Sequence, residues 1–371
     1  MIATAWCGRR LARAAEWLTT PLLPDDYLGL VNPLWSASEP RGCVESVRRE
    51  TADATTLLIR PGRGWAGHQP GHHLRVGVEI KGVLHWRVYS ITSAPDSSEG
   101  LVSITVKTLP GGRVSPHLGR HTAPGTVLRL GSAGGDFTLP DPVPPRLLLL
   151  TAGVGITPVM GILRALAARD AVPDTMLVHS AATPQDVVFG PELRELARRT
   201  AALRLHEHYT RMHPGGPGAG ARSGRLTADR LAGLVPDWRE RDTWACGPAG
   251  MLEAVERHWA RAGIAEQLHV ERFRVATTTA AGAEASGSGR VRFTVSGREA
   301  DAAPCVPLLV VGEDAGVAMP SGCRMGICHS CVARLVGGRV RDLRTGRIHG
   351  EAGDLVQTCV SAAAGPVHLE L

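Results

Sequence analysis

Three cysteines lie within the twelve residues PSGCRMGICHSC, at positions 320–331. Cys323, Cys328 and Cys331 are spaced C-x4-C-x2-C, and a fourth cysteine, Cys359, follows in QTCV. Arginines interrupt the apolar stretch at the start of the chain, which is therefore no secretory signal, and the thiols belong to a reducing compartment. Clustered thiols in such a compartment indicate metal binding or redox chemistry rather than structural disulfides.

A second chemical pattern is TAGVGITP, residues 151–158, between an apolar segment and a helical one. Gly153 and Gly155 have no side chains that would keep a phosphate from the backbone amides and the helix N-terminus. The design recurs in WACGPAGML, which places Cys246 and Gly247 at a later strand end. Open parallel sheets bind ligands at such ends, so the motifs predict a nucleotide site, with a tight turn as the alternative.

The motif RVYS, from Arg87 to Ser90, combines a cation, an aromatic ring and a hydroxyl at the end of a predicted strand. Further on, LPGGRVSPHL supplies Gly111, Gly112 and Ser115. The arginine and the glycine-serine turn could clamp a diphosphate, while the tyrosine and serine could line a flat ring. An ordinary strand and hairpin is the alternative that the pattern leaves open.

The elements that position these motifs change in character along the chain. Segments such as TTLLIRP, HLRVGVEI, WRVYSIT, LVSITVKTL and TVLRLG have strand lengths with turn residues between them, and helical periodicity is almost absent there. They predict an antiparallel barrel. From RLLLLTAGVG onward, apolar strands alternate with helices, which predicts an open parallel sheet with crossover helices.

At 371 residues the chain is too long for one ordinary core, which predicts two or three domains. The small and polar stretch TTTAAGAEASGSG is typical of a flexible linker. We predict an N-terminal helical extension at 1–41, a barrel at 42–140, a nucleotide-binding domain at 141–274, a linker at 275–289 and a cysteine-bearing domain at 290–371.

The net charge of +6 and the 43% hydrophobic content are those of a globular protein. A modest charge spread over the chain does not indicate a nucleic-acid binder; the simplest interpretation is a solvated surface, and docking of an acidic protein is the alternative. No apolar run could span a bilayer. We predict a cytoplasmic protein whose N-terminal helix packs on its own body, with contact at the inner face of the membrane as the alternative.

The motifs R-x-Y-S, G-G-x-V-S, G-V-G-I-T-P and C-G-P occur in this order, and the chain thereby resembles the ferredoxin-NADP reductase superfamily. SGCRMGICHSC with QTC resembles a plant-type 2Fe-2S ferredoxin domain. The resemblance covers roughly residues 42–371. It implies a multidomain α/β plus β fold: an antiparallel FAD-binding β-barrel, an open parallel α/β nucleotide-binding domain and a C-terminal β-grasp ferredoxin-like domain.

The resemblance implies that a 2Fe-2S cluster is held by Cys323, Cys328, Cys331 and Cys359. Two glycines in the loop let it turn with its amides facing the sulfurs. Zinc is the alternative metal, but zinc ribbons favour paired C-x2-C knuckles and this loop lacks the second.

The resemblance also assigns the flavin site. Arg87, Tyr89 and Ser90 match the motif that holds the flavin, and the Ser90 hydroxyl is expected beside the nitrogen that receives hydride, a catalytic role. The residues that match the diphosphate turn are Gly112, Val114 and Ser115. This turn resembles the FAD form, whereas the phthalate dioxygenase reductase type has the same domain order with FMN and a different turn. We therefore predict FAD.

The nicotinamide-nucleotide site is assigned in the same way. The residues that match the pyrophosphate loop are Gly153, Gly155, Thr157 and Pro158. Cys246, Gly247 and Pro248 match the motif whose thiol lies against the nicotinamide, so that Cys246 is a second catalytic candidate.

The choice between NADPH and NADH depends on cations for the ribose phosphate. Bacterial NADPH-dependent relatives have an arginine shortly after a V-H strand, where this chain has Ala182. Two further arginines of those relatives align with Arg211 and Arg225. The two matches favour NADPH, and NADH is the alternative.

Together these parts imply an NAD(P)H-dependent oxidoreductase. The nicotinamide delivers two electrons as hydride and the cluster holds one, so FAD between them must release electrons singly. The leading segment WLTTPLLPDDYLGLVNPLWS resembles reductases that serve actinobacterial acyl-CoA desaturases. We therefore predict a membrane fatty acyl-CoA desaturase as the protein electron acceptor.

Three alternatives stay open. The acceptor could belong to an alkane, aromatic-ring or haem monooxygenase or dioxygenase system. The iron-sulfur cluster could instead be a redox sensor, although a sensor needs no hydride-accepting flavin. The chain could also reduce a small molecule directly at the flavin, which would make the C-terminal domain dispensable for turnover.

Overall fold

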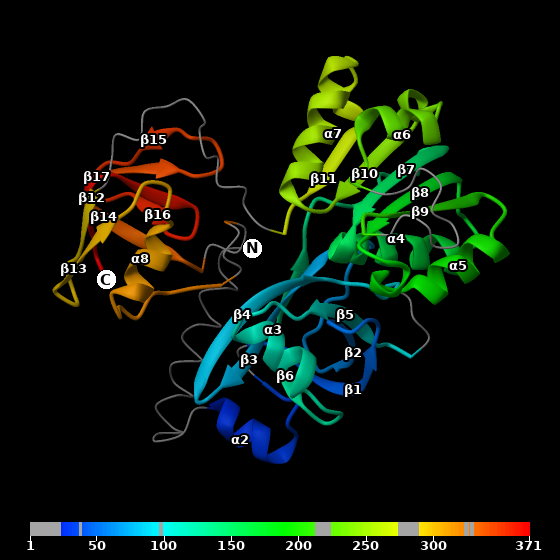
Figure 1. Ribbon diagram of the computed structural model, residues 1–371. Coiled ribbons are helices and arrows are strands. Elements are labelled where there is room, and N and C mark those ends of the chain that lie inside the picture. Colours follow the sequence, from blue (N-terminus) through cyan, green and yellow to red (C-terminus); the bar gives the residue numbers. More distant parts are fainter. Residues whose placement is uncertain are drawn as a thin grey trace. The chain divides into compact units, whose positions relative to one another are not determined.

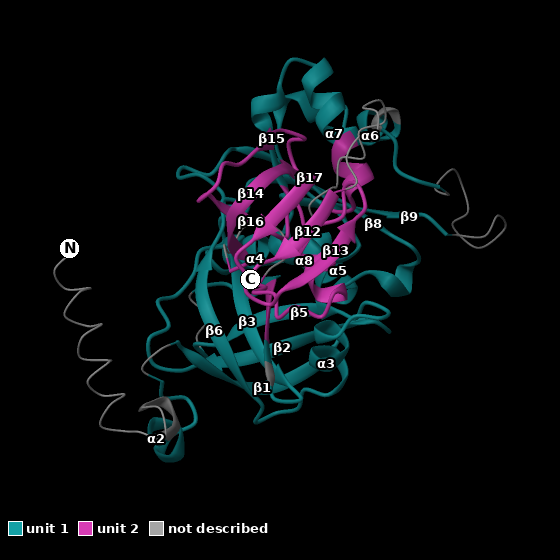
Figure 2. Cartoon of the chain, turned by 90° about the vertical axis from the view of Figure 1, so that its left-hand side faces the viewer, with its two compact units in different colours: residues 1–84, 89–246, 254–270 teal, residues 85–88, 247–253, 271–371 magenta. Residues whose placement is uncertain are grey.

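The computed structural model describes residues 24–36, 39–95, 99–211, 224–273, 289–322, 326 and 330–371. Contacts divide the chain into two compact units (Figure 2). The first is Met1–Leu84, Tyr89–Cys246 and Ala254–Val270, and the second is His85–Val88, Gly247–Glu253 and Glu271–Leu371. The described strands form three sheets, and the predicted fold class is confirmed.

The antiparallel sheet contains β1 (Arg41–Arg49), β2 (Ala54–Pro61), β3 (His73–Ile80), β4 (Val83–Ser90), β5 (Val102–Lys107) and β6 (Val127–Gly134) (Figure 1). Its strand order is β4-β3-β6-β1-β2-β5. Ile91, directly after β4, forms an antiparallel bridge with Ile104 of β5. The two ends of the sheet therefore meet, and the sheet closes into a barrel.

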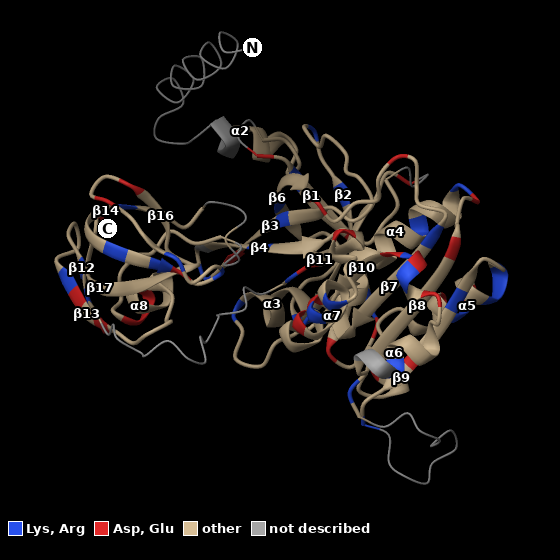
Figure 3. Ribbon diagram, turned by 90° about the horizontal axis from the view of Figure 1, so that it is seen from above, with Lys and Arg blue, Asp and Glu red and all other residues tan. Residues whose placement is uncertain are grey.

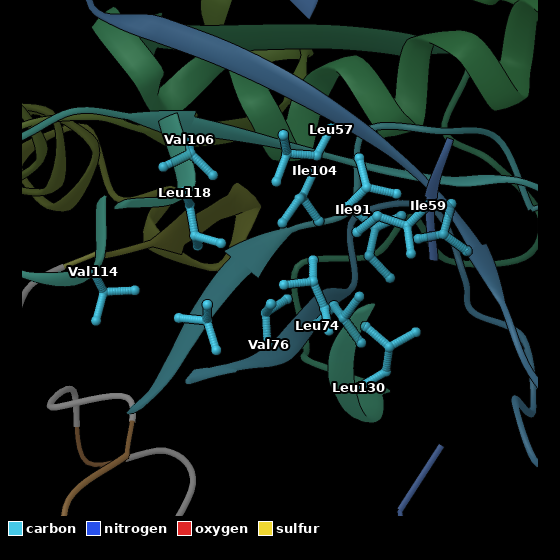
Figure 4. Packing of buried hydrophobic residues seen from close by; sticks show 14 residues of the cluster. Leu57, Ile59, Leu74, Val76, Ile91, Ile104, Val106, Val114, Leu118 and Leu130 are labelled. Atoms are coloured by element: carbon cyan, nitrogen blue, oxygen red, sulfur yellow. The ribbon is translucent and has the colours of Figure 1, made fainter. Parts of the chain in front are cut away.

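The barrel interior is filled by buried aliphatic side chains, such as Leu57, Leu74 and Ile104 (Figure 4). A short helix, α3 (Val114–Arg120), adds Val114 and Leu118 to this core. Helix α3 lies where the sequence predicts a turn. Because the strands alternate inward and outward side chains, the apolar positions of each strand share this one interior.

The parallel sheet has the order β11-β10-β7-β8-β9. Its strands are β7 (Arg146–Ala152), β8 (Asp174–Ala181), β9 (Leu203–Tyr209), β10 (Asp242–Cys246) and β11 (Leu268–Glu271). Its helices are α4 (Ile156–Ala168), α5 (Gly190–Arg199), α6 (Ala228–Leu234) and α7 (Ala249–Arg261), with 3-10 turns η1 (Gly153–Gly155), η2 (Pro184–Asp186), η3 (Trp238–Glu240) and η4 (Ala265–Gln267). The central strand β7 is the apolar run RLLLLTA, as expected of a parallel strand covered on both faces.

The third sheet is mixed. It contains β12 (Gly289–Phe293), β13 (Arg298–Ala302), β14 (Val332–Asp342), β15 (Ile348–His349) and β17 (Ser361–Leu369), while β16 (Leu355–Gln357) pairs with β14. Strands β12 and β17 are parallel, and their neighbours are antiparallel. Helix α8 (Leu308–Asp314) buries Leu308 and Val311 against Phe293 and Val340 of this sheet. This arrangement is the predicted β-grasp domain.

Only part of the predicted N-terminal extension is described, and it contains helix α2 (Pro24–Val31). Residues 1–23 and almost all of the predicted linker at 275–289 lie outside the described residues. The domain boundaries stay predictions. Each helix in the described part of the chain is too short or too polar to cross a membrane.

A buried arginine joins the amino ends of three parallel strands. Arg241, directly before β10, is fully buried. Its Nη1 donates to the carbonyl oxygens of Leu147 (3.2 Å) and Asp174 (3.0 Å), at the starts of β7 and β8. Its Nη2 donates to the carboxylates of Asp174 (2.8 Å) and Asp237 (2.7 Å). These hydrogen bonds lower the pKa of both aspartates.

We predict that Arg241→Met lowers the free energy of unfolding by about 3 kcal/mol, because two interior carbonyls and two carboxylates lose their donor. Urea unfolding of the holoprotein measures this. Arg204→Gln is the matched control, because Arg204 binds the same Asp174 carboxylate at 2.9 Å from an exposed position. Its cost should stay below about 1 kcal/mol, and equal costs for both variants would contradict the assignment.

The difference between wild type and Arg241→Met should also depend on pH. The lowered aspartate pKa values stabilise the fold fully above the unfolded-state pKa of about 3.9, and this stabilisation is lost as the pH falls through the lower folded-state values. The difference in unfolding free energy should therefore shrink below about pH 4.

Candidate active site

The predicted flavin motif occupies the end of β4. Ser90 is the last residue of β4 and is 4% exposed, and among the described residues its Oγ has no hydrogen-bond partner. Tyr89 packs against the barrel core, and Arg87 donates from Nη1 to the carbonyl oxygen of Trp86 at 2.7 Å. A buried hydroxyl without a partner is costly, so this position fits a polar ligand atom such as those of a flavin ring.

The predicted diphosphate turn joins β5 to α3. The amide of Gly112 donates to the carbonyl of Leu109 at 3.0 Å, and Ser115 Oγ accepts from the Leu109 amide at 3.1 Å. Val114 anchors the start of α3 in the barrel core. A Cβ on Gly112 would lie 3.0 Å from both Leu109 O and Ser115 Oγ, which is tighter than ordinary packing. The three residues therefore shape one closed turn.

The predicted pyrophosphate loop follows β7. Gly153 has φ +54°, and a Cβ there would meet no heavy atom within 4 Å. Its left-handed backbone favours glycine and leaves open space at the strand end. Gly155 caps α4, and Thr157 Oγ1 donates to the Val154 carbonyl at 2.9 Å. Thr157 and Pro158 are buried in the first turn of α4, so the loop fits a phosphate near the helix N-terminus.

The C-G-P motif begins at the end of β10. Cys246 is fully buried and pairs in register with Thr151 of β7. Strands β8 and β9 lie on one side of β7 and strands β10 and β11 on the other. The glycine loop and Cys246 therefore occupy neighbouring carboxyl ends at the point where the strand order reverses, the usual ligand crevice of such sheets. Pro248 starts α7 by accepting amide hydrogen bonds from Met251 and Leu252.

The two predicted ribose-phosphate arginines lie beyond β8 and β9. The Arg211 amide donates to the carbonyl of Ala182 at 2.9 Å. The buried His208 of β9 has its Nε2 2.7 Å from the carbonyl of Gly224, the residue before Arg225. Both arginines are exposed. Arg211 is thus held at this edge of the sheet by its own backbone, and Arg225 by the contact of the preceding residue. Their role stays a prediction.

Two of the four predicted cluster ligands are described. The Sγ atoms of Cys331 and Cys359 are 3.2 Å apart, and both cysteines are buried. A disulfide would place the sulfurs about 2.05 Å apart, so the two thiols converge without a disulfide bond, as metal ligands can. Cys323 and Cys328 lie outside the described residues.

Residues that the sequence reasoning missed support this cysteine pair. Thr358 donates its amide and its Oγ1 to the Cys331 carbonyl, at 3.1 and 2.8 Å. Gln357 Nε2 donates to the carbonyl of Gly326 at 2.9 Å. Gly326 has φ +75°, and a Cβ there would lie 2.9 Å from Val360 and 3.0 Å from Arg344 Nη1. In the sequence, only the QTC motif pointed to these contacts of Gln357 and Thr358.

A second missed feature joins the barrel to the nucleotide helix. A Cβ on Gly161 of α4 would lie 2.5 Å from the carbonyl oxygen of Ile91. One turn later, Arg164 Nη1 donates to the carbonyl of Thr92 at 2.7 Å, and its Nε and Nη2 bind both carboxylate oxygens of Glu192. Helix α4 therefore docks on the backbone that directly follows Ser90. A glycine within a strong helical pattern is the signal that could have found it.

Three family models match the chain. They are the oxidoreductase FAD-binding domain at residues 58–139, the oxidoreductase NAD-binding domain at 149–257 and the 2Fe-2S iron-sulfur cluster binding domain at 293–364. These matches show the three cofactor-binding domains.

Similar proteins extend over most of the chain. An NADPH oxidoreductase of Mycobacterium tuberculosis is 49% identical over 364 residues, covering 97% of this chain and 92% of its own. A glycine betaine monooxygenase reductase subunit of Chromohalobacter salexigens is 32% identical over 321 residues, covering 81% and 87%. The structure of phthalate dioxygenase reductase aligns with a TM-score of 0.62 at 22% identity, covering 90% and 98%, and has the same fold.

We predict that Gly161→Val slows reduction of the bound flavin by NAD(P)H roughly 10²-fold, because the new side chain displaces α4 from Ile91 and a shift of about 1 Å between reacting groups has this effect. Anaerobic stopped-flow absorbance measures the rate, and the flavin content should be unchanged.

Gly233→Ala is the matched control, because Gly233 is also helical and its added Cβ meets no heavy atom within 4 Å. It should reduce at the wild-type rate. A Gly161→Val rate equal to that of the control would show that the close contact does not position the nucleotide.

Proposed function

The chain belongs to the ferredoxin-reductase-type oxidoreductases that combine FAD-binding and NAD-binding domains with a 2Fe-2S domain, and we propose that it delivers electrons singly from NADPH to an oxygen-activating protein partner. The observation that supports this proposal is the presence, in one chain, of a pair of FAD-binding and NAD-binding domains, which suits hydride transfer, and of a 2Fe-2S domain, which suits one-electron transfer. A redox sensor would need only the second. Direct reduction of a small molecule at the flavin would need only the first.

FAD, when bound, takes two electrons as hydride and returns them singly, which is what a one-electron cluster requires. The chain's own residues set the geometry. Arg87, Tyr89 and Ser90 would hold the ring, with the buried Ser90 hydroxyl supplying a hydrogen bond at its edge. The turn formed by Gly112, Val114 and Ser115 would hold the diphosphate.

On the nucleotide side, Gly153 and Gly155 leave room at the N-terminus of α4 for the pyrophosphate, and Thr157 braces the loop. The buried Cys246, followed by Gly247 and Pro248, would press against the nicotinamide and exclude water from it. Arg211 and Arg225 would bind the ribose phosphate as exposed cations, which favours NADPH. The name of the Mycobacterium tuberculosis relative supports this donor.

For the acceptor we propose a membrane fatty acyl-CoA desaturase, reached from the cytoplasm at the inner face of the membrane. This choice depends on the leading segment WLTTPLLPDDYLGLVNPLWS, whose described part contains α2. The second candidate is the oxygenase of a monooxygenase or dioxygenase system, which the name of the Chromohalobacter salexigens relative favours. Both acceptors take electrons one at a time from a protein donor.

An anaerobic visible-absorbance titration with NADPH, repeated with NADH, tests the proposal. We expect the flavin band to bleach and the broad iron-sulfur absorption to follow, at lower NADPH than NADH. Bleaching of flavin alone, with no iron-sulfur absorption after anaerobic reconstitution, would leave a simple flavin reductase. Equal midpoints for the two nucleotides would contradict the roles of Arg211 and Arg225.

We further predict that Cys246→Ser slows flavin reduction by about one to two orders of magnitude while the flavin stays bound, because the smaller oxygen no longer packs against the nicotinamide. Cys43→Ser is the control, since Cys43 lies on β1 outside every proposed site. Stopped-flow reduction with NADPH measures both variants. An unchanged rate for Cys246→Ser would show that this thiol only packs the core.

A further inference from the structure

Charge is unevenly distributed within the C-terminal domain. Residues 324–347 contain one carboxylate, Asp342, and six arginines, at positions 324, 334, 339, 341, 344 and 347. The rest of residues 289–371 contains three arginines and seven carboxylates. Four of those carboxylates lie on β13 and α8 (Figure 3). The domain is therefore nearly neutral as a whole but has a basic side.

We call Arg339, Arg341, Arg344 and Arg347 the arginine face. Arg339 and Arg341 lie on β14, and the other two lie in the turn between β14 and β15. Along β14 the buried Val340 alternates with these two arginines, so they point away from the core. Arg339, Arg344 and Arg347 are exposed, and Arg341 is half-buried.

The arginine face borders the cysteine pair because β14 bends. Its first residue, Val332, pairs with Gln357, and its last residue, Asp342, pairs with Ser361. Register shifts on either side of Gly337 and Gly338 bend the strand. Both ends of β14 thus flank the short segment that carries Cys359.

The contacts of Arg344 place the face beside the cysteine loop. The amide of Leu343 donates to the carbonyl of Val360 at 2.8 Å, directly after Cys359. Arg344 Nη1 lies 3.0 Å from where a Cβ on Gly326 would be. Arg344 therefore lies next to the segment that carries Cys359, and Arg339, Arg341 and Arg347 continue the same basic strand and turn, away from it.

The charge of the face is available to a partner. Asp342 binds Arg344 through both carboxylate oxygens. Arg339 and Arg341 donate instead to the carbonyls of Ile348 (3.3 Å) and Gly346 (3.2 Å). Within the described residues, Arg339, Arg341 and Arg347 form no ion pair with a carboxylate. Carbonyl anchoring orients a guanidinium without neutralising it.

The opposite edge of the sheet provides a contrast. Arg290 and Arg292 of β12 lie within 4.0 Å of Glu299 and Asp301 of β13. Those arginines already have carboxylate partners, so they offer less net charge to a second protein. The arginines at the two edges therefore differ in how far neighbouring carboxylates compensate their charge.

We propose that the arginine face is the surface on which the electron acceptor docks, and that it takes an acidic protein surface. This inference rests on the proposed function. Because Cys331 and Cys359 are buried, an acceptor must approach the edge of the cluster closely, and the arginine face is the charged surface beside it. Oriented arginines bind carboxylates in bidentate fashion and attract an acidic partner from a distance, which speeds association at low salt.

The test uses the holoprotein, NADPH and two probes of opposite charge, the acidic haem protein cytochrome b5 and the basic haem protein cytochrome c. The variant is R339Q/R341Q/R347Q, which spares Arg344 and its contact with the cysteine loop. The matched control is R290Q/R292Q, which removes two paired arginines from the other edge. Anaerobic reduction of each probe is followed at low and at high ionic strength.

We expect the triple variant to reduce cytochrome b5 roughly tenfold or more slowly at low salt, with a flatter salt dependence. Its rate with cytochrome c should not fall, and the control should match wild type with both probes. A wild-type cytochrome b5 rate in the triple variant would overturn the docking role.

Reduction of the cluster by NADPH, read from its absorbance in the same samples, separates the two proposals. A cluster that is reduced normally in the triple variant, with slow cytochrome b5 reduction, supports docking. A cluster that NADPH does not reduce in wild type overturns the proposed function and the docking role with it. If the triple variant instead loses only its binding to phosphatidylserine vesicles and keeps its cytochrome b5 rate, the face contacts lipid, and the acidic-protein proposal fails.

Discussion

Helix α4 packs directly on the backbone of the barrel, because Gly161 has no side chain that would keep the two apart. Ile91 receives this contact, and the same residue closes the barrel by bridging to Ile104. One strand end therefore serves both domains. It completes the barrel, and it contacts the helix that starts at the Gly153 loop. Arg164 secures the arrangement through Thr92 and Glu192. The relative position of Ser90 and the Gly153 loop depends on this short backbone contact.

The C-terminal domain meets a similar demand with glycine in a strand. Gly337 and Gly338 let β14 bend, so that both of its ends reach the segment that holds Cys359. At Gly338, with φ +91°, a Cβ would lie 2.1 Å from the carbonyl oxygen of Pro366, so no other residue fits the bend without moving the backbone. In both units, glycines let backbone segments approach closely, and groups that are far apart in the sequence thereby come together.

Much of this fold could be predicted from local pattern. The apolar run of β7 and the alternating strands of the barrel have periods that favour one structure. Strand β1 was missed because RGCVESVRR has few apolar residues and its second half is exposed. Helix α3 is seven residues long and carries no strong period. For the sites, spacing predicts the glycines and cysteines. Gly161 and Gln357 stand in patterns that mark their positions but not the groups they contact, whereas Arg241 and Arg344 act through tertiary contacts that no local pattern encodes.

The Ser90 hydroxyl, which has no hydrogen-bond partner in the described part of the chain, also has a consequence for protein stability. A hydrogen bond to a buried hydroxyl that otherwise lacks a partner is worth about 1–3 kcal/mol. A flavin that bonds to Ser90, as proposed, would therefore stabilise the barrel, and flavin binding and folding would be thermodynamically linked. A difference of this size changes the steady-state abundance of a protein several-fold, because proteases act on the unfolded fraction. Riboflavin supply would then control how much of this reductase a cell retains, in addition to how much of it is active.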